Sequence, residues 1–113
     1  MPAMTLVKRN KRVALHLPVE VRGEDVSGTR FTELTHSVNV SGGGILFESH
    51  RQIPIGARLV LRIELPVMLR HHFGDRDTYR ARAVVCRVEQ LEGRETRRVG
   101  ARFLRSANPG EVL

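Results

Sequence analysis

The sequence contains few aromatic residues: no tryptophan, one tyrosine and four phenylalanines among 113 residues. Domains that bind single-stranded nucleic acid commonly stack successive bases on aromatic side chains. The shortage of rings therefore argues against a binding surface of that kind.

Cysteine and long apolar segments are equally scarce. The single cysteine, Cys86, cannot form an internal disulfide, which fits a reducing compartment. The first residues contain no apolar run that resembles a signal peptide, and no stretch approaches the roughly 20 apolar residues of a membrane span. These absences predict a cytoplasmic protein without membrane insertion. Cys86 lies close to Val84, Val85 and Val88, and this setting predicts a buried, unreactive thiol.

No arrangement of residues points to catalysis. The sequence shows neither a nucleophile with a nearby base nor a distinctive pair of carboxylates. Of the five histidines only His71 and His72 are close, and adjacent residues of an extended chain point to opposite faces. We therefore expect a binding module with no catalytic residues, no metal and no cofactor.

The charge of the chain predicts an anionic partner. It has 19 Lys and Arg residues against 12 Asp and Glu residues, which gives a net charge of +7 with histidine neutral. A domain this basic favours nucleotides, nucleic acid, acidic lipids or an acidic protein surface. Most individual arginines would also be explained as ordinary solvated surface residues that keep the protein soluble.

The apolar pattern predicts an all-β fold. The clearest alternation runs over 57–65, where leucine and isoleucine alternate with charged residues and valine. Residues 67–77 have no clear period and are expected to form a loop. The predicted strands cover 13–22, 30–40, a segment from Ile45, 57–65, 79–88 and 97–104. Short strands at this spacing are typical of a small antiparallel barrel or sandwich.

Two polar motifs stand apart from the strand pattern. The first is the basic cluster Lys8-Arg9-Asn10-Lys11-Arg12 on a leader with no predicted structure. The second is the turn Asn39-Val40-Ser41-Gly42-Gly43-Gly44, which offers a carboxamide, a hydroxyl and glycine backbone that permits close approach. Together they suit a small, flat, doubly charged anion such as a nucleotide.

These motifs resemble the PilZ domain, the bacterial receptor module for cyclic di-GMP. The family pattern is Arg-x-x-x-Arg before the first strand and Asp/Asn-x-Ser-x-x-Gly after the second. The second motif matches at Asn39, Ser41 and Gly44, and Gly100-Ala101-Arg102-Phe103 resembles the family's closing strand. The resemblance covers residues 8–107. It implies a six-stranded antiparallel PilZ-type barrel over 13–107, a flexible basic leader over 1–12 and a tail over 108–113.

The resemblance also implies a set of ligand-binding residues, with one departure from the family pattern. When the motif is aligned on Arg12, its first arginine falls on Lys8, and Arg9 is one position out of register. Lysine neutralises a phosphate but has no planar bidentate fork. The expected ligand-binding residues are Lys8, Arg9, Arg12, Asn39, Ser41, Gly44 and Arg102.

Simpler roles exist for several of these residues. The leader would then be a disordered basic tail, Asn39 a turn residue that tolerates a left-handed backbone, and Ser41 a residue that bonds its own backbone. Three functions stay open at this point. The first is a cyclic di-GMP receptor that orders its leader and changes its contacts with an effector protein. The others are a PilZ-like adaptor that has lost the nucleotide and, third in order, a basic barrel for RNA or single-stranded DNA.

Overall fold

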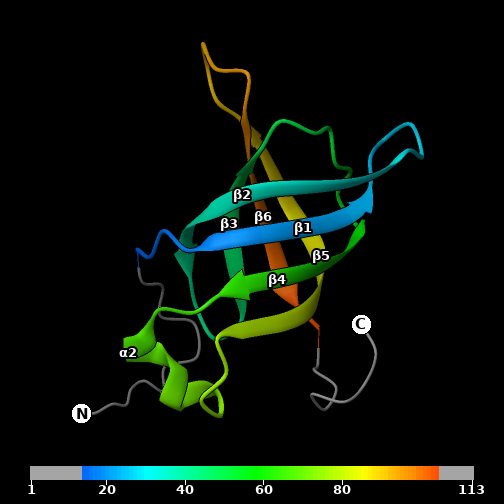
Figure 1. Cartoon of the computed structure of the whole chain (residues 1–113). Helices are drawn as coiled ribbons and strands as arrows, with labels where there is room; N and C mark the ends of the chain where they lie inside the picture. Colours follow the sequence, from blue (N-terminus) through cyan, green and yellow to red (C-terminus); the bar gives the residue numbers. More distant parts are fainter. Residues whose placement is uncertain (1–13, 105–113) are drawn as a thin grey trace.

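The computed structural model describes residues 14–104, which form a closed barrel of six antiparallel strands (Figure 1). The expectations for Lys8, Arg9, Arg12 and the tail 108–113 lie outside these residues. The predicted all-β, six-stranded barrel is confirmed. The strands are β1 (Pro18–Glu24), β2 (Arg30–Val40), β3 (Gly44–Ser49), β4 (Arg58–Glu64), β5 (Thr78–Gln90) and β6 (Arg97–Phe103), with α2 (Val67–Arg70) and η1 (His71–Phe73) between β4 and β5.

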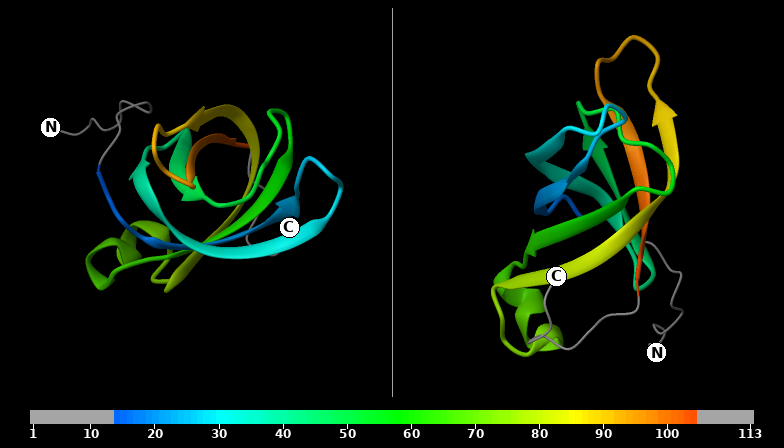
Figure 2. Two further views of the ribbon diagram at one scale, coloured as in Figure 1. Left: turned by 90° about the horizontal axis from the view of Figure 1, so that it is seen from above. Right: turned by 90° about the vertical axis from the view of Figure 1, so that its right-hand side faces the viewer.

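The barrel closes because β1 pairs with two neighbours. The strand order is β1-β2-β3-β6-β5-β4, and β1 pairs with β2 on one side and with β4 on the other, where Val19 lies opposite Ile63. Full closure leaves no strand edge open to another chain. Figure 2 shows the strands curving around a common interior.

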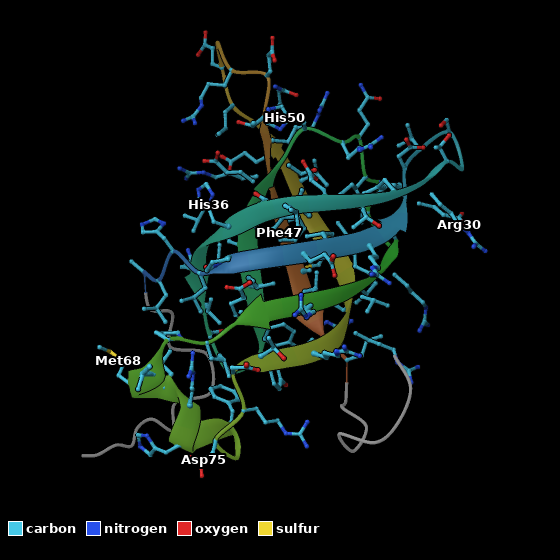
Figure 3. All side chains as sticks on the ribbon, in the orientation of Figure 1. Arg30, His36, Phe47, His50, Met68 and Asp75 are labelled. Carbon is cyan, nitrogen blue, oxygen red and sulfur yellow. The ribbon has the colours of Figure 1, made fainter. Side chains whose placement is uncertain are left out.

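The interior is filled by the apolar side chains that the alternation predicted. In β4, Leu59, Leu61 and Ile63 are buried, whereas the alternating Arg58 and Arg62 are exposed and Val60 is half-buried. Phe47 of β3 is fully buried at the centre of the barrel (Figure 3). The strands thus present one apolar face inward and one polar face to solvent, as half-buried strands do.

Two predicted boundaries were wrong. The first strand begins at Pro18 and not at Val13, which agrees with the preference of proline for the first position of a strand. Residues 67–77 are not only a loop. They contain the helical turn of α2, in which the Leu69 N–H donates to the Pro66 carbonyl at 2.9 Å, followed by the 3₁₀ turn η1. Met68 of α2 is 75% exposed and projects from the barrel (Figure 3).

The expected burial of Cys86 is also wrong. The thiol is exposed, and it donates a weak hydrogen bond to the Gly100 carbonyl at 3.4 Å. The reason lies in β5, where Val85 faces the core and the pairing with β6 shifts between Val85 and Arg87. This bulge leaves Cys86 on the outer surface.

Over the described part of the chain, no helix is long and apolar enough to cross a membrane.

Candidate functional site

The hydroxyl of Ser41 holds the turn of the second motif. It accepts hydrogen bonds from the N–H groups of Gly43 at 3.1 Å and Gly44 at 3.2 Å, while the Ser41 N–H donates to the Gly44 carbonyl at 2.9 Å. The hydroxyl proton makes only a long contact of 3.5 Å with the Gly44 carbonyl. Ser41 therefore shapes the turn with its lone pairs, and its proton is the part best suited to an external acceptor.

Gly44 is required by the packing of β3 against β6. A Cβ at this position would lie 2.4 Å from the Ala101 carbonyl oxygen and 3.3 Å from the Arg102 Cα. The turn is fixed to β6 a second time, since the Phe103 N–H donates to the Gly43 carbonyl at 2.9 Å. The close approach expected of Gly44 from the sequence is thus made here to a neighbouring strand.

A bulge in β2 sets the outward position of Asn39. The pairing of β2 with β3 shifts between Ser37 and Asn39, so that Asn39 lies opposite Leu46 and Val40 lies opposite Ile45. Ser37 and Ile45 face the interior, where both are fully buried. The extra residue, Val38, shifts the alternation by one and leaves Asn39, half-buried, on the outer side.

Arg102 lies on the outer surface directly opposite Gly44. The register pairs these two residues across β3 and β6, and Arg102 is exposed. Elsewhere on β6, Arg98 lies 3.9 Å from the Glu48 carboxylate, which also lies 3.5 Å from Arg94. In residues 14–104, no ion pair joins Arg102 to a carboxylate. The structure thus brings Asn39, Ser41, Gly44 and Arg102 to one end of the β2–β3–β6 surface.

The sequence reasoning missed Ser37, which fixes the segment 14–17 beside the motif. Its N–H donates to the Leu17 carbonyl at 2.9 Å, its hydroxyl accepts from the Leu17 N–H at 2.9 Å, and the same hydroxyl donates to the Leu15 carbonyl. The Nδ1 of His16 adds a bond of 3.1 Å to the Ser37 carbonyl. The one available signal was a polar residue at an inward position of β2. In the sequence, Arg12 comes two residues before this segment and lies outside the described residues.

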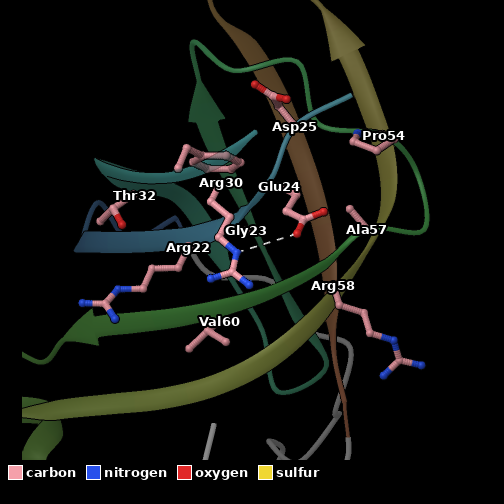
Figure 4. A pocket seen from close by; sticks show the side chains of 11 residues that line it. Arg22, Gly23, Glu24, Asp25, Arg30, Thr32, Pro54, Ala57, Arg58 and Val60 are labelled. Atoms are coloured by element: carbon pink, nitrogen blue, oxygen red, sulfur yellow. Dashed lines mark ion pairs between the residues drawn. The ribbon is translucent and has the colours of Figure 1, made fainter. Parts of the chain in front are cut away.

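A surface depression lies mainly away from these residues. It has a volume of about 830 Å³ and is lined by Arg22, Gly23 and Glu24 of β1, by Arg30 of β2 and by Arg58 and Val60 of β4, among others (Figure 4). Glu24 and Arg30 form an ion pair of 3.9 Å at its rim. It lies at the start of β2, roughly 30 Å along that strand from the motif turn. The sequence motif and this depression are therefore separate features.

Metal ligands do not gather in the described part of the barrel. Among residues 14–104, no group of three His, Cys, Asp or Glu side chains is placed to hold a metal ion.

The family model of the PilZ domain matches residues 7–111 of the chain. The chain belongs to the PilZ family. This match covers the barrel together with the whole basic cluster. PilZ domains are generally receptors or adaptors for cyclic di-GMP signalling. No curated protein sequence matches the chain significantly.

Two solved structures share the barrel. The Bacillus subtilis inhibitor of motility, MotI/DgrA, is 25% identical, with a TM-score of 0.62 over 85% of this chain and 42% of that protein. MrkH of K. pneumoniae, solved in its apo state, is 16% identical, with a TM-score of 0.54 over 83% of this chain and 41% of MrkH. The PilZ domain described here thus spans less than half the length of either protein, and the likeness to MrkH concerns the fold alone.

Ser37 gives a prediction that separates positioning from stability. Ser37→Ala leaves the Leu17 N–H and the Leu15 carbonyl without their partner, which costs about 1–3 kcal/mol of unfolding free energy. We also expect cyclic di-GMP affinity to fall several-fold, because the segment that follows the leader loses both hydrogen bonds to the Ser37 hydroxyl and keeps only those to the Ser37 backbone. Calorimetric titration and urea unfolding measure the two effects.

Ser49→Ala is the matched control. Ser49 is equally buried, and its hydroxyl donates to the Glu33 carboxylate at 2.6 Å and accepts from the Arg51 N–H at 2.9 Å. This variant should lose comparable stability and keep its affinity. An equal loss of affinity in both variants would assign the effect to general destabilisation and not to the leader.

Proposed function

We propose that this PilZ domain binds cyclic di-GMP on the outer surface of the barrel, between the basic leader and the turn of the second motif. The observation that carries the proposal is the gathering of Asn39, Ser41, Gly44 and Arg102 at one end of β2–β3–β6, beside a segment that Ser37 fixes in place. Ligand donors from two distant parts of the sequence thereby meet at one site.

Each residue has a distinct chemical task in this proposal. Guanine presents two acceptors, O6 and N7, on one edge, and an arginine fork matches both. Arg12 and Arg9 supply such forks from the leader, whereas Lys8 supplies a counter-charge for a phosphate. The remaining contacts come from the barrel: the Asn39 carboxamide on the guanine amide edge, the Ser41 hydroxyl proton on an acceptor, and Arg102 on a phosphate.

Binding would place the leader, residues 1–12, against the barrel, residues 13–107. An ordering step of this kind changes the surface that a second protein meets. We infer that the domain signals to an effector protein in this way, with the tail 108–113 outside the ligand site. The ligand is cyclic di-GMP itself, and no further cofactor enters the proposal.

Calorimetric titration tests the proposal directly. We expect saturable binding of cyclic di-GMP and weaker binding of GTP and cyclic di-AMP, because adenine has an amino donor where guanine has O6, and an arginine fork rejects it. Equal affinity for the two cyclic dinucleotides would contradict the guanine contacts. If the domain bound none of these three nucleotides, an adaptor that acts through protein contacts alone would be favoured. A short oligonucleotide that bound more tightly would favour a nucleic-acid function.

A further inference from the structure

A second basic surface lies on the outer side of β1, β4 and β5. The register of these strands places their exposed residues in rows. Glu20, Arg62 and Arg80 form one row, and Arg22, Val60 and Arg82 form the next. Arg58 follows on β4, opposite Val84 of β5. We call the exposed residues Arg22, Arg58, Arg62, Arg80 and Arg82 the arginine face.

Three arginines of the face, Arg58, Arg62 and Arg80, carry charge that no ion pair offsets within residues 14–104. Arg62 and Arg80 are directly opposite each other on adjacent antiparallel strands, which brings their Cβ atoms within about 5.5 Å. Like charges in this position destabilise a sheet. Arg22 lies 3.6 Å from the Glu20 carboxylate, but in residues 14–104 no ion pair joins Arg58, Arg62 or Arg80 to a carboxylate. A partner that supplies anions would offset this repulsion.

The composition of the face favours a protein as that partner. The only lysines of the sequence are Lys8 and Lys11, so every Lys or Arg side chain of the barrel is an arginine. Arginine is enriched and lysine depleted in protein interfaces, and a guanidinium binds a carboxylate with two parallel hydrogen bonds. Half-buried Val60 and Val84 lie between the arginines, where they offer apolar contact.

Two acidic residues strengthen the same argument. Glu20 and Glu64 lie on the outward side of β1 and β4, beside the arginines of the face. They would repel a phosphodiester backbone, yet they can pair with cations of a protein. A depression of about 270 Å³, lined by Glu20, Arg22, Val60, Leu61, Arg62 and Arg80, gives the face a concave centre.

We propose that the arginine face docks a protein surface in which Asp and Glu side chains surround apolar residues. This surface goes beyond the nucleotide site. In the closed strand order, β4 lies across the barrel from β3, whereas β5 adjoins β6, where Val84 lies opposite Arg102. The arginine face therefore borders the nucleotide site at β5, and its centre lies farther round the barrel. The inference rests on the centre of the face, at Arg62 and Arg80, which includes no residue of the nucleotide site.

The test uses two synthetic peptides of equal length and charge, one of glutamate and serine and the other of glutamate and leucine. We expect the glutamate–leucine peptide to bind more tightly by fluorescence anisotropy. Arg62→Gln/Arg80→Gln should weaken it at least about fivefold, and Val60→Thr should remove its advantage over the serine peptide. The control Arg94→Gln/Arg98→Gln changes net charge equally, at residues that pair with Glu48 away from the arginine face, and should leave binding unchanged.

Stability gives an independent readout. Arg80→Gln alone should raise the urea midpoint, because it removes the like charge opposite Arg62. Asn39→Ala keeps peptide binding while it weakens cyclic di-GMP, so failure of either proposal is visible separately. The inference is overturned if neither peptide binds, if the control weakens binding as much as the arginine-face variant, or if the urea midpoint falls. Tighter binding of duplex DNA, or of phosphatidylglycerol vesicles, through Arg62 and Arg80 overturns it as well.

Discussion

Arg12→Ala should lower cyclic di-GMP affinity tenfold or more and leave the free energy of unfolding almost unchanged. A hydrogen bond to a charged group contributes about 1.5–3 kcal/mol, which corresponds to a loss of at least tenfold. Stability should persist because Arg12 precedes the anchored segment 14–17 and all six strands. Calorimetric titration and urea unfolding on one preparation measure both quantities. A collapse of stability together with affinity would make Arg12 a structural residue.

The two neighbouring cations decide how the leader compensates for the missing arginine of its motif. If Lys8 occupies that place, Lys8→Arg should strengthen binding a few-fold, because a guanidinium engages two acceptors at once. If Arg9 fills it instead, Arg9→Ala is the damaging change and Lys8→Arg is silent. Unchanged affinity in both variants would reduce the role of the leader to Arg12.

The strands were predictable because each has one buried face. Alternation identified Leu59, Leu61 and Ile63 as interior residues, and all three are buried. The same pattern gave the right number of strands, since Gly and Pro separate most of them. The segment 67–77 was harder, because α2 and η1 are too short to show a helical period. Its hydrogen bonds include one from the Leu69 N–H to the Pro66 carbonyl and one from the Asp75 N–H to the Arg70 carbonyl, and no sequence period predicts them.

Bulges explain most of what the sequence did not reveal. A bulge adds one residue to one strand, and no residue type marks it reliably. The bulge at Val38 turns Asn39 outward, and the bulge near Cys86 accompanies an exposed thiol among valines. The contribution of Ser37 was equally hidden, because its partners, Leu15 and Leu17, are about 20 residues away along the chain.

The position of the candidate site was predictable from its sequence motif, whereas the structural role of each motif residue was not. Asn39, Ser41, Gly44 and Arg102 are gathered by the β2–β3 turn and the pairing of β3 with β6. However, Ser41 accepts two backbone hydrogen bonds within the turn, and Gly44 meets the backbone of β6. Residues of such a motif can be required by the fold, by the ligand or by both. Substitutions that measure stability and affinity side by side are needed to separate these two requirements.

Gly44→Ala tests whether the glycine at this position is required by the fold or by the ligand. Of the substitutions described, we expect it to lower the free energy of unfolding most. The new Cβ would lie 2.4 Å from the Ala101 carbonyl oxygen, so β3 and β6 must move apart. Overpacking typically costs about 1–3 kcal/mol and sometimes more, and the rigid backbone on both sides places this case at about 2–3 kcal/mol. Urea unfolding measures the loss directly.

Gly100→Ala is the matched control on the opposing strand. Its Cβ would meet the Arg87 Cβ at 3.6 Å and the Leu46 Cδ1 at 3.8 Å, which are ordinary contacts, and no carbonyl lies closer than 3.9 Å. Stability should change by less than about 0.5 kcal/mol or rise slightly, since alanine lowers the entropy of the unfolded chain. If Gly44→Ala instead kept its stability and lost only cyclic di-GMP affinity, the glycine would face the ligand, and the ligand would be the reason for a glycine at this position.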